Sequence, residues 1–270
     1  MRFLGALGGR ATAVGKASTQ RGADRPRLFC FPHAGGGPLM FRDWGPALTG
    51  AIEVCPVSLP GREDRLAEAP FTRLTPLVDA LAHELVPHMR TRAAFFGHSL
   101  GALVAFEVAR RLRSTRGLLP VHLFVSASLP PESVNRQRRL HQLPRTELVR
   151  ELRRFEGTPP ELLESDEFVE LILPTLRADL AIVETYVYED DTELECPISV
   201  FGGVADRTVT PEKLLGWRAH TSGIFALRTY PGGHFFLHEA QAAVLGAVSA
   251  DLFQSAQPAA ATTSRTIAGR

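Results

Sequence analysis

The sequence predicts an α/β protein with a mostly parallel sheet, helices on both faces of that sheet, and an inserted helical lid. Short runs that are apolar throughout alternate with segments of helical spacing, which is typical of strands buried on both faces and connected by helices. One long stretch, 132–190, has helical spacing but no confident strand. The chain has 270 residues, of which 44% are apolar and 22% charged, so a single domain of this class can bury a substantial core.

The first half of the predicted core alternates apolar runs with helical segments. A glycine-rich loop, PHAGGG, follows the first apolar run. In residues 74–90 the apolar side chains recur every three or four positions, as on one face of a helix. The expected strands here are 27–31, 52–57 and 93–98, and the expected helices are 41–48, 74–90 and 102–112.

The second half has three more apolar runs, and the stretch 132–190 lies between the first two of them. Apolar side chains in this stretch have helical spacing around Leu152 and again around Leu176. Because helices inserted between two strands of a sheet form a natural lid, we expect a lid here. The expected strands are 121–127, 197–203 and 224–230, and a final helix is expected from about 239 to 253.

The folded domain is expected to span residues 27–254. Residues 1–26 are expected to form a flexible leader, because the apolar stretch MRFLGALGG is too short and glycine-rich for a secretory signal. Residues 10–23 contain no acid, a composition that transit peptides share, so a transit peptide is the alternative. The small and polar residues 255–270 are expected to form a disordered tail. No stretch approaches 18 uninterrupted apolar residues, so no membrane-spanning helix is expected.

Charge and cysteine content narrow the classes of partner and compartment. The net charge of +1 gives no overall attraction to nucleic acid or to an anionic membrane. The three cysteines are odd in number and form no CxxC motif, so free buried thiols are expected rather than disulfides or metal ligands. The loop PHAGGG lacks the Lys-Ser/Thr pair of a P-loop. We therefore expect a cytoplasmic monomer with no metal or nucleotide cofactor.

The segment FFGHSLGALVAFE places Ser99 between two glycines, after an apolar run and before a helical segment. Residues 97–101 match the pattern G-x-S-x-G. In a strand–turn–helix context this pattern predicts a nucleophile elbow, a sharp turn that exposes the serine hydroxyl. The glycines would let the strand and the helix approach each other without Cβ clashes. The alternative is a chance match in a glycine-rich turn, so the partners of the serine decide between the two.

A serine hydroxyl is a weak nucleophile and needs a base and an orienting acid, expected in the chain order Ser, acid, His. In open parallel sheets, functional residues lie at the carboxyl ends of strands. His234 follows the run 224–230 directly on a glycine-rich loop. Asp206 lies just beyond the run 197–203. We therefore predict a catalytic triad of Ser99, Asp206 and His234.

Three other histidines fail this test of position. His98 precedes the serine and is expected to point into the packing beneath the elbow. His220 comes before its nearest strand, which places it at the opposite edge of the sheet. His238 follows His234 by four residues and is expected to lie inside the last helix.

The acidic candidates leave one alternative open. Asp190 and Asp191 come before the run 197–203, at its opposite end, and are expected in a solvated turn. Asp206 could instead cap a helix that begins near Pro211.

An acyl transfer also needs N–H donors aimed at the tetrahedral oxygen. The backbone N–H of Leu100 follows the serine at a helix N-terminus and is one expected donor. The loop PHAGGG occupies the position of the second donor, for which we predict the backbone N–H of Ala34. Because the donors are main chain, His33 is expected to be structural.

Seven segments, in this order, resemble the stand-alone type II thioesterases of polyketide and nonribosomal peptide assembly lines: LFCFPHAGGG, SLPGRE, FFGHSLGALVAFEVARRLR, ELRRFEGTP, LPTLRADLAIVETYVY, CPISVFGG and YPGGHFFL. The resemblance implies an α/β-hydrolase fold with a helical lid. It also implies hydrolysis of acyl groups from the phosphopantetheine arms of carrier proteins, with the triad on Ser99, Asp206 and His234. Many members have methionine where this chain has Leu100, and since a main-chain donor is involved, activity is expected to survive.

The resemblance implies an acyl or peptidyl carrier protein as partner, and such carriers usually present an acidic helix. Arg150, Arg153 and Arg154 of the expected lid are candidates for docking it. A solvated helical face is the alternative. The arginines that crowd the lid are Arg136, Arg138, Arg139, Arg145, Arg150, Arg153 and Arg154.

The acyl pocket is expected between Ser99 and the apolar lid faces near Phe155, Phe168 and Leu176. Three rival functions stay open at this point. A general serine esterase would act on free esters, and an acyltransferase would pass the acyl group to an alcohol or amine instead of water. A module without catalysis would only bind acylated carriers.

Overall fold

The computed structural model describes residues 25–48, 50–89, 92–134, 139–155, 157, 159 and 161–254. Most of the expected leader and all of the expected tail lie outside these residues. Arg136, Arg138 and the side chain of Phe155 also lie outside this description. None of the helices among the described residues has the length and apolar character needed to cross a bilayer.

Six strands form one sheet in the order β2-β1-β3-β4-β5-β6, and each pair of neighbours is parallel. The sheet predicted from the apolar runs is confirmed, and every predicted strand is present within about two residues of its expected bounds. The strands are β1 (Arg27–Phe31), β2 (Glu53–Pro56), β3 (Ala93–His98), β4 (Leu123–Ser126), β5 (Ile198–Gly203) and β6 (Phe225–Tyr230).

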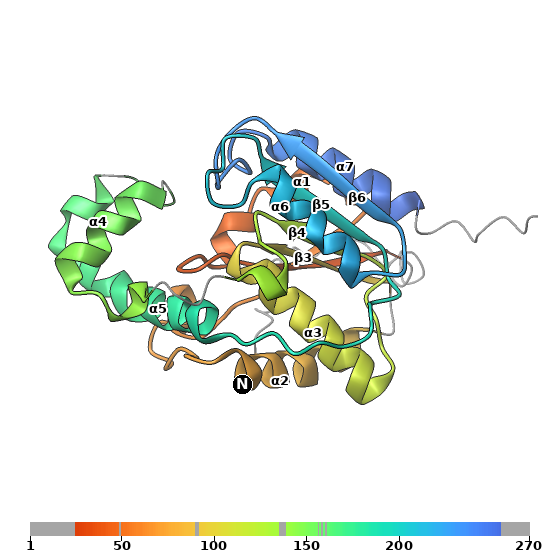
Figure 1. Ribbon diagram of the computed structural model, residues 1–270, viewed down its shortest axis with the longest axis horizontal. Coiled ribbons are helices and arrows are strands. Elements are labelled where there is room, and N and C mark those ends of the chain that lie inside the picture. The colour runs from red at the N-terminus through yellow and green to blue at the C-terminus, as the bar shows by residue number, and fades with distance from the viewer. Residues whose placement is uncertain are drawn as a thin grey trace, which may run out of the picture.

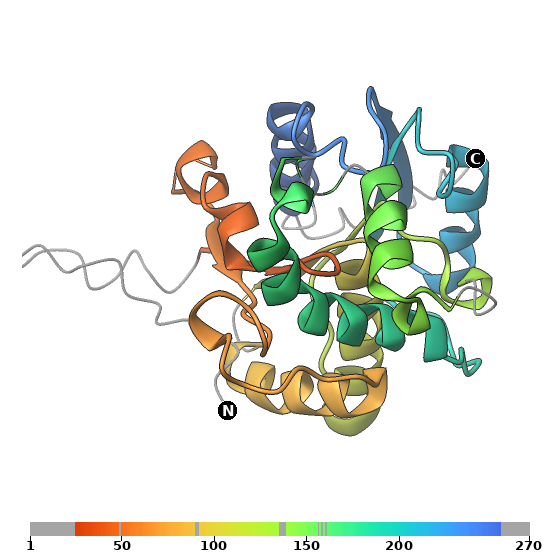
Figure 2. The ribbon, with the colours of Figure 1, turned by 90° about the vertical axis from the view of Figure 1, so that its left-hand side faces the viewer.

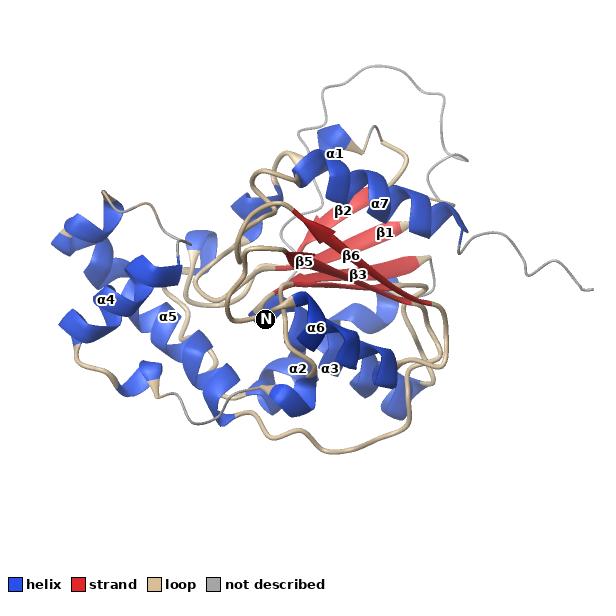
Figure 3. Cartoon of the chain, turned by 45° about the horizontal axis from the view of Figure 1, so that its top comes forward, coloured by secondary structure: helices blue, strands red, loops and turns tan. Residues whose placement is uncertain are grey.

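Helices cover both faces of this sheet. The α-helices are α1 (Trp44–Ala47), α2 (Leu74–Leu85), α3 (Leu100–Arg116), α4 (Arg145–Phe155), α5 (Asp166–Thr185), α6 (Pro211–Leu214) and α7 (Gln241–Gln254). Short 3-10 helices span Pro38–Phe41, Glu63–Arg65, Val86–His88, Pro131–Ser133, Leu140–Gln142, Leu162–Glu164 and Leu215–His220. Figure 3 shows α1 and α7 on one face of the sheet and α2, α3 and α6 on the other.

The strands send apolar side chains to both faces in turn. In β1, Phe29 and Phe31 belong to the core cluster that contains α2 and α3, whereas Leu28 and Cys30 belong to the cluster that contains α1 and α7. A strand covered on both faces has no solvated side, which explains why the strand sequences are apolar throughout.

The predicted lid is present as α4 and α5, inserted between β4 and β5. Figure 1 shows both helices at one side of the molecule, and in Figure 3 the strands point toward that side. Leu148 and Leu152 of α4 are buried in a small cluster with Leu173 and Leu176 of α5. The lid thus has an apolar core of its own. In Figure 2, which faces the lid, α5 passes in front of the central sheet.

Polar contacts stabilise the lid helix α5, one within the lid and one to the central domain. Its first turn is capped by Ser165, whose Oγ accepts a hydrogen bond from the N–H of Phe168 at 3.3 Å. Further along α5, the hydroxyl of Thr175 donates to the backbone oxygen of Gly61, in the loop after β2. The side chain of Thr175 is buried, so this bond is shielded from water.

Several helix bounds differ from expectation. The helix expected over 41–48 is reduced to α1 after a 3-10 turn, and the helix expected over 102–112 extends from Leu100 to Arg116. The helix expected over 74–90 ends as an α-helix at Leu85 and continues as a 3-10 turn, because Pro87 has no N–H to continue the α-helical pattern. The final helix begins at Gln241. The prediction that His238 lies inside that helix is therefore wrong. The three cysteines are buried and free, as predicted.

Candidate active site

The turn between β3 and α3 holds Ser99 in a strained backbone conformation. Its φ is 55° and its ψ is −118°, although it is not a glycine. Positive φ at such a residue costs on the order of 1–3 kcal/mol and persists only where the surroundings enforce it. Here the N–H of Ser99 donates to the backbone oxygen of Ser126 at the end of β4, at 2.8 Å. The predicted elbow is thus built at the carboxyl edge of the sheet.

Two glycines allow the helix to lie so close to the strands. A Cβ on Gly97 would come within 2.3 Å of the backbone oxygen of Gly101. A Cβ on Gly101 would come within 2.1 Å of the backbone oxygen of Phe31. Both distances are shorter than any ordinary contact and involve backbone atoms that cannot turn away. The close approach of α3 to β1 and β3 therefore requires glycine at both positions.

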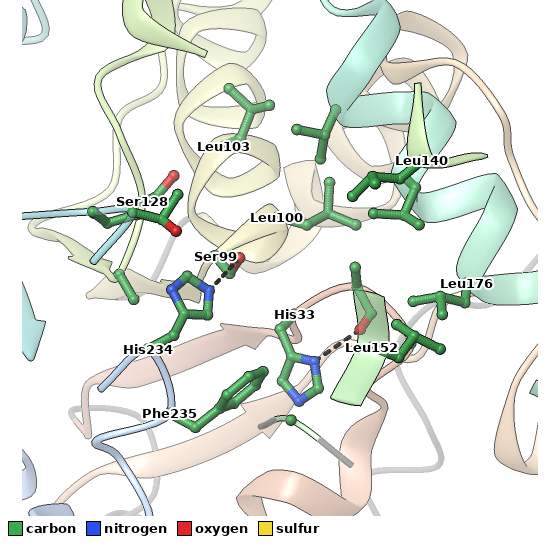
Figure 4. A pocket seen from close by; sticks show the side chains of 18 of the residues that line it. His33, Ser99, Leu100, Leu103, Ser128, Leu140, Leu152, Leu176, His234 and Phe235 are labelled. Carbon is green, nitrogen blue, oxygen red and sulfur yellow. Dashed lines mark hydrogen bonds between the residues drawn. The ribbon is translucent and has the colours of Figure 1, made fainter. Parts of the chain in front are cut away.

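The elbow brings the serine to the two partners predicted for it, and Figure 4 shows Ser99 beside His234. The hydroxyl of Ser99 lies 3.0 Å from Nε2 of His234, and Nδ1 of His234 lies 2.7 Å from Oδ2 of Asp206. Since an ionised carboxylate only accepts hydrogen bonds, Nδ1 of His234 carries the proton and donates it to Asp206. Nε2 is then free to accept the hydroxyl proton of Ser99. The three residues form one hydrogen-bonded chain across three loops.

The second carboxylate oxygen of Asp206 organises its own loop. It accepts hydrogen bonds from the N–H groups of Thr208 and Val209, at 2.8 and 2.9 Å. Burial alone would raise the pKa of Asp206, but the hydrogen bond from His234, the two backbone bonds and the charge of His234 together lower it below its usual range. The alternative role as a helix cap does not hold, because α6 is preceded by Thr210.

The three other histidines considered as the base lie where they cannot serve. His98 is fully buried beneath the elbow, with Nδ1 at 2.9 Å from the hydroxyl of Ser126. Burial holds the pKa of His98 well below its usual value, so the ring is neutral. His220 lies 2.8 Å from a carboxylate oxygen of Glu132, away from the serine. His238 is exposed in the turn before α7.

A second group of serine, histidine and aspartate side chains lies at the opposite edge of the sheet. The hydroxyl of Ser199 lies 2.9 Å from Nε2 of His122 and donates to Asp251 at 2.6 Å. The serine proton is thus engaged by the carboxylate rather than by the imidazole. None of the three side chains lines the cavity at Ser99. We infer that this group is structural.

The two expected oxyanion donors lie at the same cavity as Ser99. The N–H of Leu100 is in the first turn of α3, where N–H groups have no partner within the helix. Ala34 lies in a tight turn closed by the N–H of Gly36, which donates to the backbone oxygen of His33 at 2.9 Å. Within the described part of the chain, the N–H of Ala34 donates to no protein group.

The turn that contains Ala34 contacts the side chain of Asp179, to which the sequence analysis gave no role. The N–H of Gly35 donates to the carboxylate of Asp179, on the lid helix α5, at 2.7 Å. Asp179 belongs to LPTLRADLAIVETYVY, one of the seven segments that carry the family resemblance. The sequence did contain a signal for Asp179, because it is an acidic residue among the apolar positions of a predicted lid helix.

An apolar cavity of about 450 Å³ extends from Ser99 into the lid. Phe168 and Leu176 line it, as expected; the side chain of Phe155 is not described. Other lid residues of the wall, which the sequence did not assign to the pocket, include Leu140, Leu152, Ile172, Leu180, Val183 and Glu184. Glu184 accepts from the N–H groups of Leu140 and His141, so its charge is met by donors of the lid itself.

The arginines expected to dock a partner lie on the outer surface of the lid. Arg150, Arg153 and Arg154 of α4 are exposed, opposite the buried face of that helix. Arg154 forms an ion pair with Glu151 at 2.6 Å. In the described part of the chain, no ion pair occupies Arg150 or Arg153. Figure 1 shows α4 as the outermost element on its side of the molecule.

Comparisons with known proteins agree on one family. The model of the thioesterase domain family matches residues 26–252. The gramicidin S biosynthesis protein GrsT of Aneurinibacillus migulanus is 43% identical over 219 residues, which cover 81% of this chain and 86% of that protein.

Solved structures give the same result. RedJ, a thioesterase of the prodiginine biosynthetic pathway in Streptomyces coelicolor, is 40% identical with a TM-score of 0.79, over 85% of this chain and 87% of RedJ. BorB, the type II thioesterase of the borrelidin biosynthetic cluster, is 38% identical with a TM-score of 0.76, over 85% of this chain and 92% of BorB.

Replacing Gly101 with alanine tests the close approach of α3 to the sheet. We expect the substitution Gly101→Ala to lower the free energy of unfolding by about 2–4 kcal/mol, because the new Cβ meets the backbone of Phe31. Urea unfolding measures the change. The matched control is Gly246→Ala in the exposed middle of α7, where a Cβ meets no atom within 4 Å and helix propensity favours alanine by up to about 1 kcal/mol. Equal stabilities of the two variants would contradict the packing argument.

Replacing Asp206 with asparagine tests the hydrogen-bonded chain. Asparagine keeps the size but lets the imidazole adopt the wrong tautomer, so we expect a fluorophosphonate probe to label Ser99 about 10³-fold more slowly. Intact-mass spectrometry over time measures the labelling rate. Asp190→Asn, an exposed acid outside the chain of bonds, and Ser199→Ala should both label at the wild-type rate. Unchanged labelling of Asp206→Asn would remove Asp206 from the site.

Proposed function

The chain belongs to the thioesterase domain family, and we propose that it hydrolyses the thioesters that join acyl groups to the phosphopantetheine arms of carrier proteins in polyketide or nonribosomal peptide biosynthesis. The α/β-hydrolase fold, the relatives that act in such pathways and the type II thioesterase BorB support this function. The observation that carries it is the hydrogen-bonded chain of Ser99, His234 and Asp206 beside an apolar cavity that Ser99 and His234 line. The role is editing, the removal of acyl groups that stall an assembly line.

In the first half of the proposed reaction, the hydroxyl oxygen of Ser99 attacks the thioester carbonyl. His234 accepts the hydroxyl proton at Nε2, and Asp206 stabilises the imidazolium and keeps its orientation. The N–H groups of Leu100 and Ala34 donate to the tetrahedral oxygen, and loss of one such donor costs about 3–4 kcal/mol of transition-state stabilisation. The C–S bond then breaks, the pantetheine sulfur takes the proton from His234, and the acyl group remains on Ser99.

In the second half, water replaces the pantetheine thiol. His234 removes a proton from the water as its oxygen attacks the acyl ester. The same two N–H groups hold the second tetrahedral oxygen. Collapse of this intermediate returns the proton to the oxygen of Ser99 and releases a free carboxylic acid. The reaction consumes one water and uses no cofactor, since phosphopantetheine arrives with the substrate.

The apolar cavity is the proposed acyl site. Burial of an alkyl chain there is favourable by about 0.8 kcal/mol per methylene group. The wall combines residues of the central domain, such as Leu103, with residues of the lid, such as Phe168 and Leu176. An acyl chain in the cavity would therefore contact both parts. The proposal assumes a monomer in the reducing cytoplasm, which suits three buried free thiols.

Two rivals act by the same hydrogen-bonded chain. A general esterase would hydrolyse free esters, and an acyltransferase would use an alcohol or amine in place of water. The names of the similar proteins favour a thioesterase over both.

The variant Ser99→Ala tests the proposed function. We expect it to release no acyl group from an acylated carrier protein, because the hydroxyl of Ser99 is the one that His234 holds among the residues that the structure describes. Intact-mass spectrometry of the carrier measures the loss of the acyl group, and Ser199→Ala should hydrolyse it at the wild-type rate.

The same assay separates the rivals. Faster turnover of a chromogenic ester than of the acyl carrier by the wild type would favour an esterase. An acyl adduct on added alcohol or amine, in place of the free acid, would favour an acyltransferase. Release by Ser99→Ala would contradict the nucleophile assignment.

The exposed arginines of α4 are proposed to dock the carrier protein. Arg150 and Arg153 project from the outer face of the helix whose inner face, through Leu152, lines the acyl cavity. A partner bound to α4 would thus lie on a helix that also lines the acyl cavity. Because the contact is between exposed charges, each ion pair contributes only about 0.2–1 kcal/mol and weakens with salt.

Reversing one charge tests this docking. We expect Arg153→Glu to lower kcat/KM for an acylated carrier about fivefold at low ionic strength, and to leave kcat/KM for a small free thioester unchanged. The matched control is Arg116→Glu, which makes the same charge change at the exposed end of α3. Equal effects of the two substitutions, or equal effects on both substrates, would mean that α4 is only a solvated face.

A further inference from the structure

The turn 33–36 is held by side chains at both ends of one peptide unit. This unit joins Ala34 to Gly35. On one side, Nδ1 of His33 donates to the backbone oxygen of Ala34 at 2.9 Å, and Figure 4 shows this bond. On the other side, the N–H of Gly35 donates to Asp179 at 2.7 Å. With both ends bonded, this peptide unit cannot rotate without breaking a hydrogen bond.

The conformation of the turn determines where the N–H of Ala34 points. Gly35 has a φ of 76°, as expected at the third position of a type II turn. The N–H of Ala34 belongs to the preceding peptide unit, whose oxygen, that of His33, accepts a hydrogen bond from the N–H of Gly36 at 2.9 Å. The contacts that hold Gly35 and Gly36 in place therefore also hold the direction of the proposed oxyanion donor.

Asp179 is itself fixed by a buried arginine. Two nitrogens of the Arg62 guanidinium donate to the two carboxylate oxygens of Asp179, both at 2.8 Å. One of these nitrogens also donates to the backbone oxygen of Gly36 at 2.9 Å. The side chains of Arg62 and Asp179 are 6% and 1% exposed. The pair thus holds the turn at two points, the N–H of Gly35 and the oxygen of Gly36.

Stability of the fold does not by itself account for this pair. Removing two charges from water is costly, and apolar residues of similar size often replace a buried ion pair without loss of stability. The lid helix α5 has other anchors, which include the hydroxyl of Thr175 on Gly61 and the apolar contacts of Leu176. What apolar residues could not replace is the acceptor for Gly35 and the donor for Gly36.

We propose that Asp179, held by Arg62, is a positioning residue that aims the N–H of Ala34 at the tetrahedral oxygen. The lid helix would then contribute to catalysis as well as to the acyl site, since Leu176 and Leu180 of α5 line the cavity. The inference rests on the proposed function, in which the N–H of Ala34 is an oxyanion donor.

The double variant Arg62→Met/Asp179→Leu tests the proposal, because it removes both buried charges together and leaves neither unpaired. We expect kcat for an acylated carrier to fall about 30- to 100-fold, KM to change less than about threefold, and the thermal midpoint to stay within a few degrees. The control is Arg27→Met/Glu53→Leu, which removes an ion pair at the amino ends of β1 and β2 and should leave kcat unchanged.

A tetrahedral analogue separates positioning from a merely structural role. A trifluoromethyl ketone analogue of the acyl thioester adds to Ser99 and places an oxyanion at the two N–H groups. Its inhibition constant should rise in the double variant by the same factor as kcat/KM falls. A structural role would lower the thermal midpoint and leave the inhibition constant of the folded fraction unchanged.

The experiments test the proposed function and the positioning role of Asp179 separately. If the wild-type chain releases no acyl group from a carrier, the proposed function fails. If the wild type is active and the double variant keeps its kcat and its affinity for the ketone, the positioning role fails. Should the double variant not fold, Asp179→Ala in the presence of intact Arg62, measured with the ketone on the folded fraction, makes the same distinction.

Discussion

The close packing of α3 against the sheet is the constraint on which the site depends. Gly97 and Gly101 leave no Cβ between the helix and the strands, so the chain turns sharply at Ser99 and holds it at a positive φ. That turn places the serine hydroxyl above the carboxyl edge of the sheet. Loops that follow two other strands bring His234 and Asp206 to the same edge. The rest of the site is arranged around this one strained residue.

The lid is integrated with the central domain rather than simply placed over it. Its inner face supplies much of the apolar cavity, and its helix α5 reaches the turn 33–36 through the carboxylate of Asp179. Charged atoms that are nearly inaccessible to water form this link, whereas the arginines on the outer face of α4 are exposed. The inner surface of the lid therefore lines the acyl cavity and bonds to the turn 33–36. Its outer surface is suited to a charged partner.

The sequence predicted the elements that depend on local pattern. Six apolar runs became six parallel strands, and the rule that functional residues follow strand ends selected His234 and Asp206 from several candidates. The contact of Asp179 with Arg62 and Gly35 could not be predicted, because it joins residues more than a hundred positions apart through a lid whose placement no periodicity encodes. The prediction for His238 failed for a local reason, since the turn after His234 continues to residue 240 before the helix begins.

The central claim is that Ser99 carries the acyl group during the reaction. Rapid acid quenching of the chain with an acylated carrier protein, followed by proteolysis and peptide mass spectrometry, tests it most directly. The peptide that contains Ser99 should gain the mass of the acyl group, and this adduct should form and decay at least as fast as free acid is released. An acyl group found on another residue, or release of acid with no adduct on Ser99 at any time, would contradict the account.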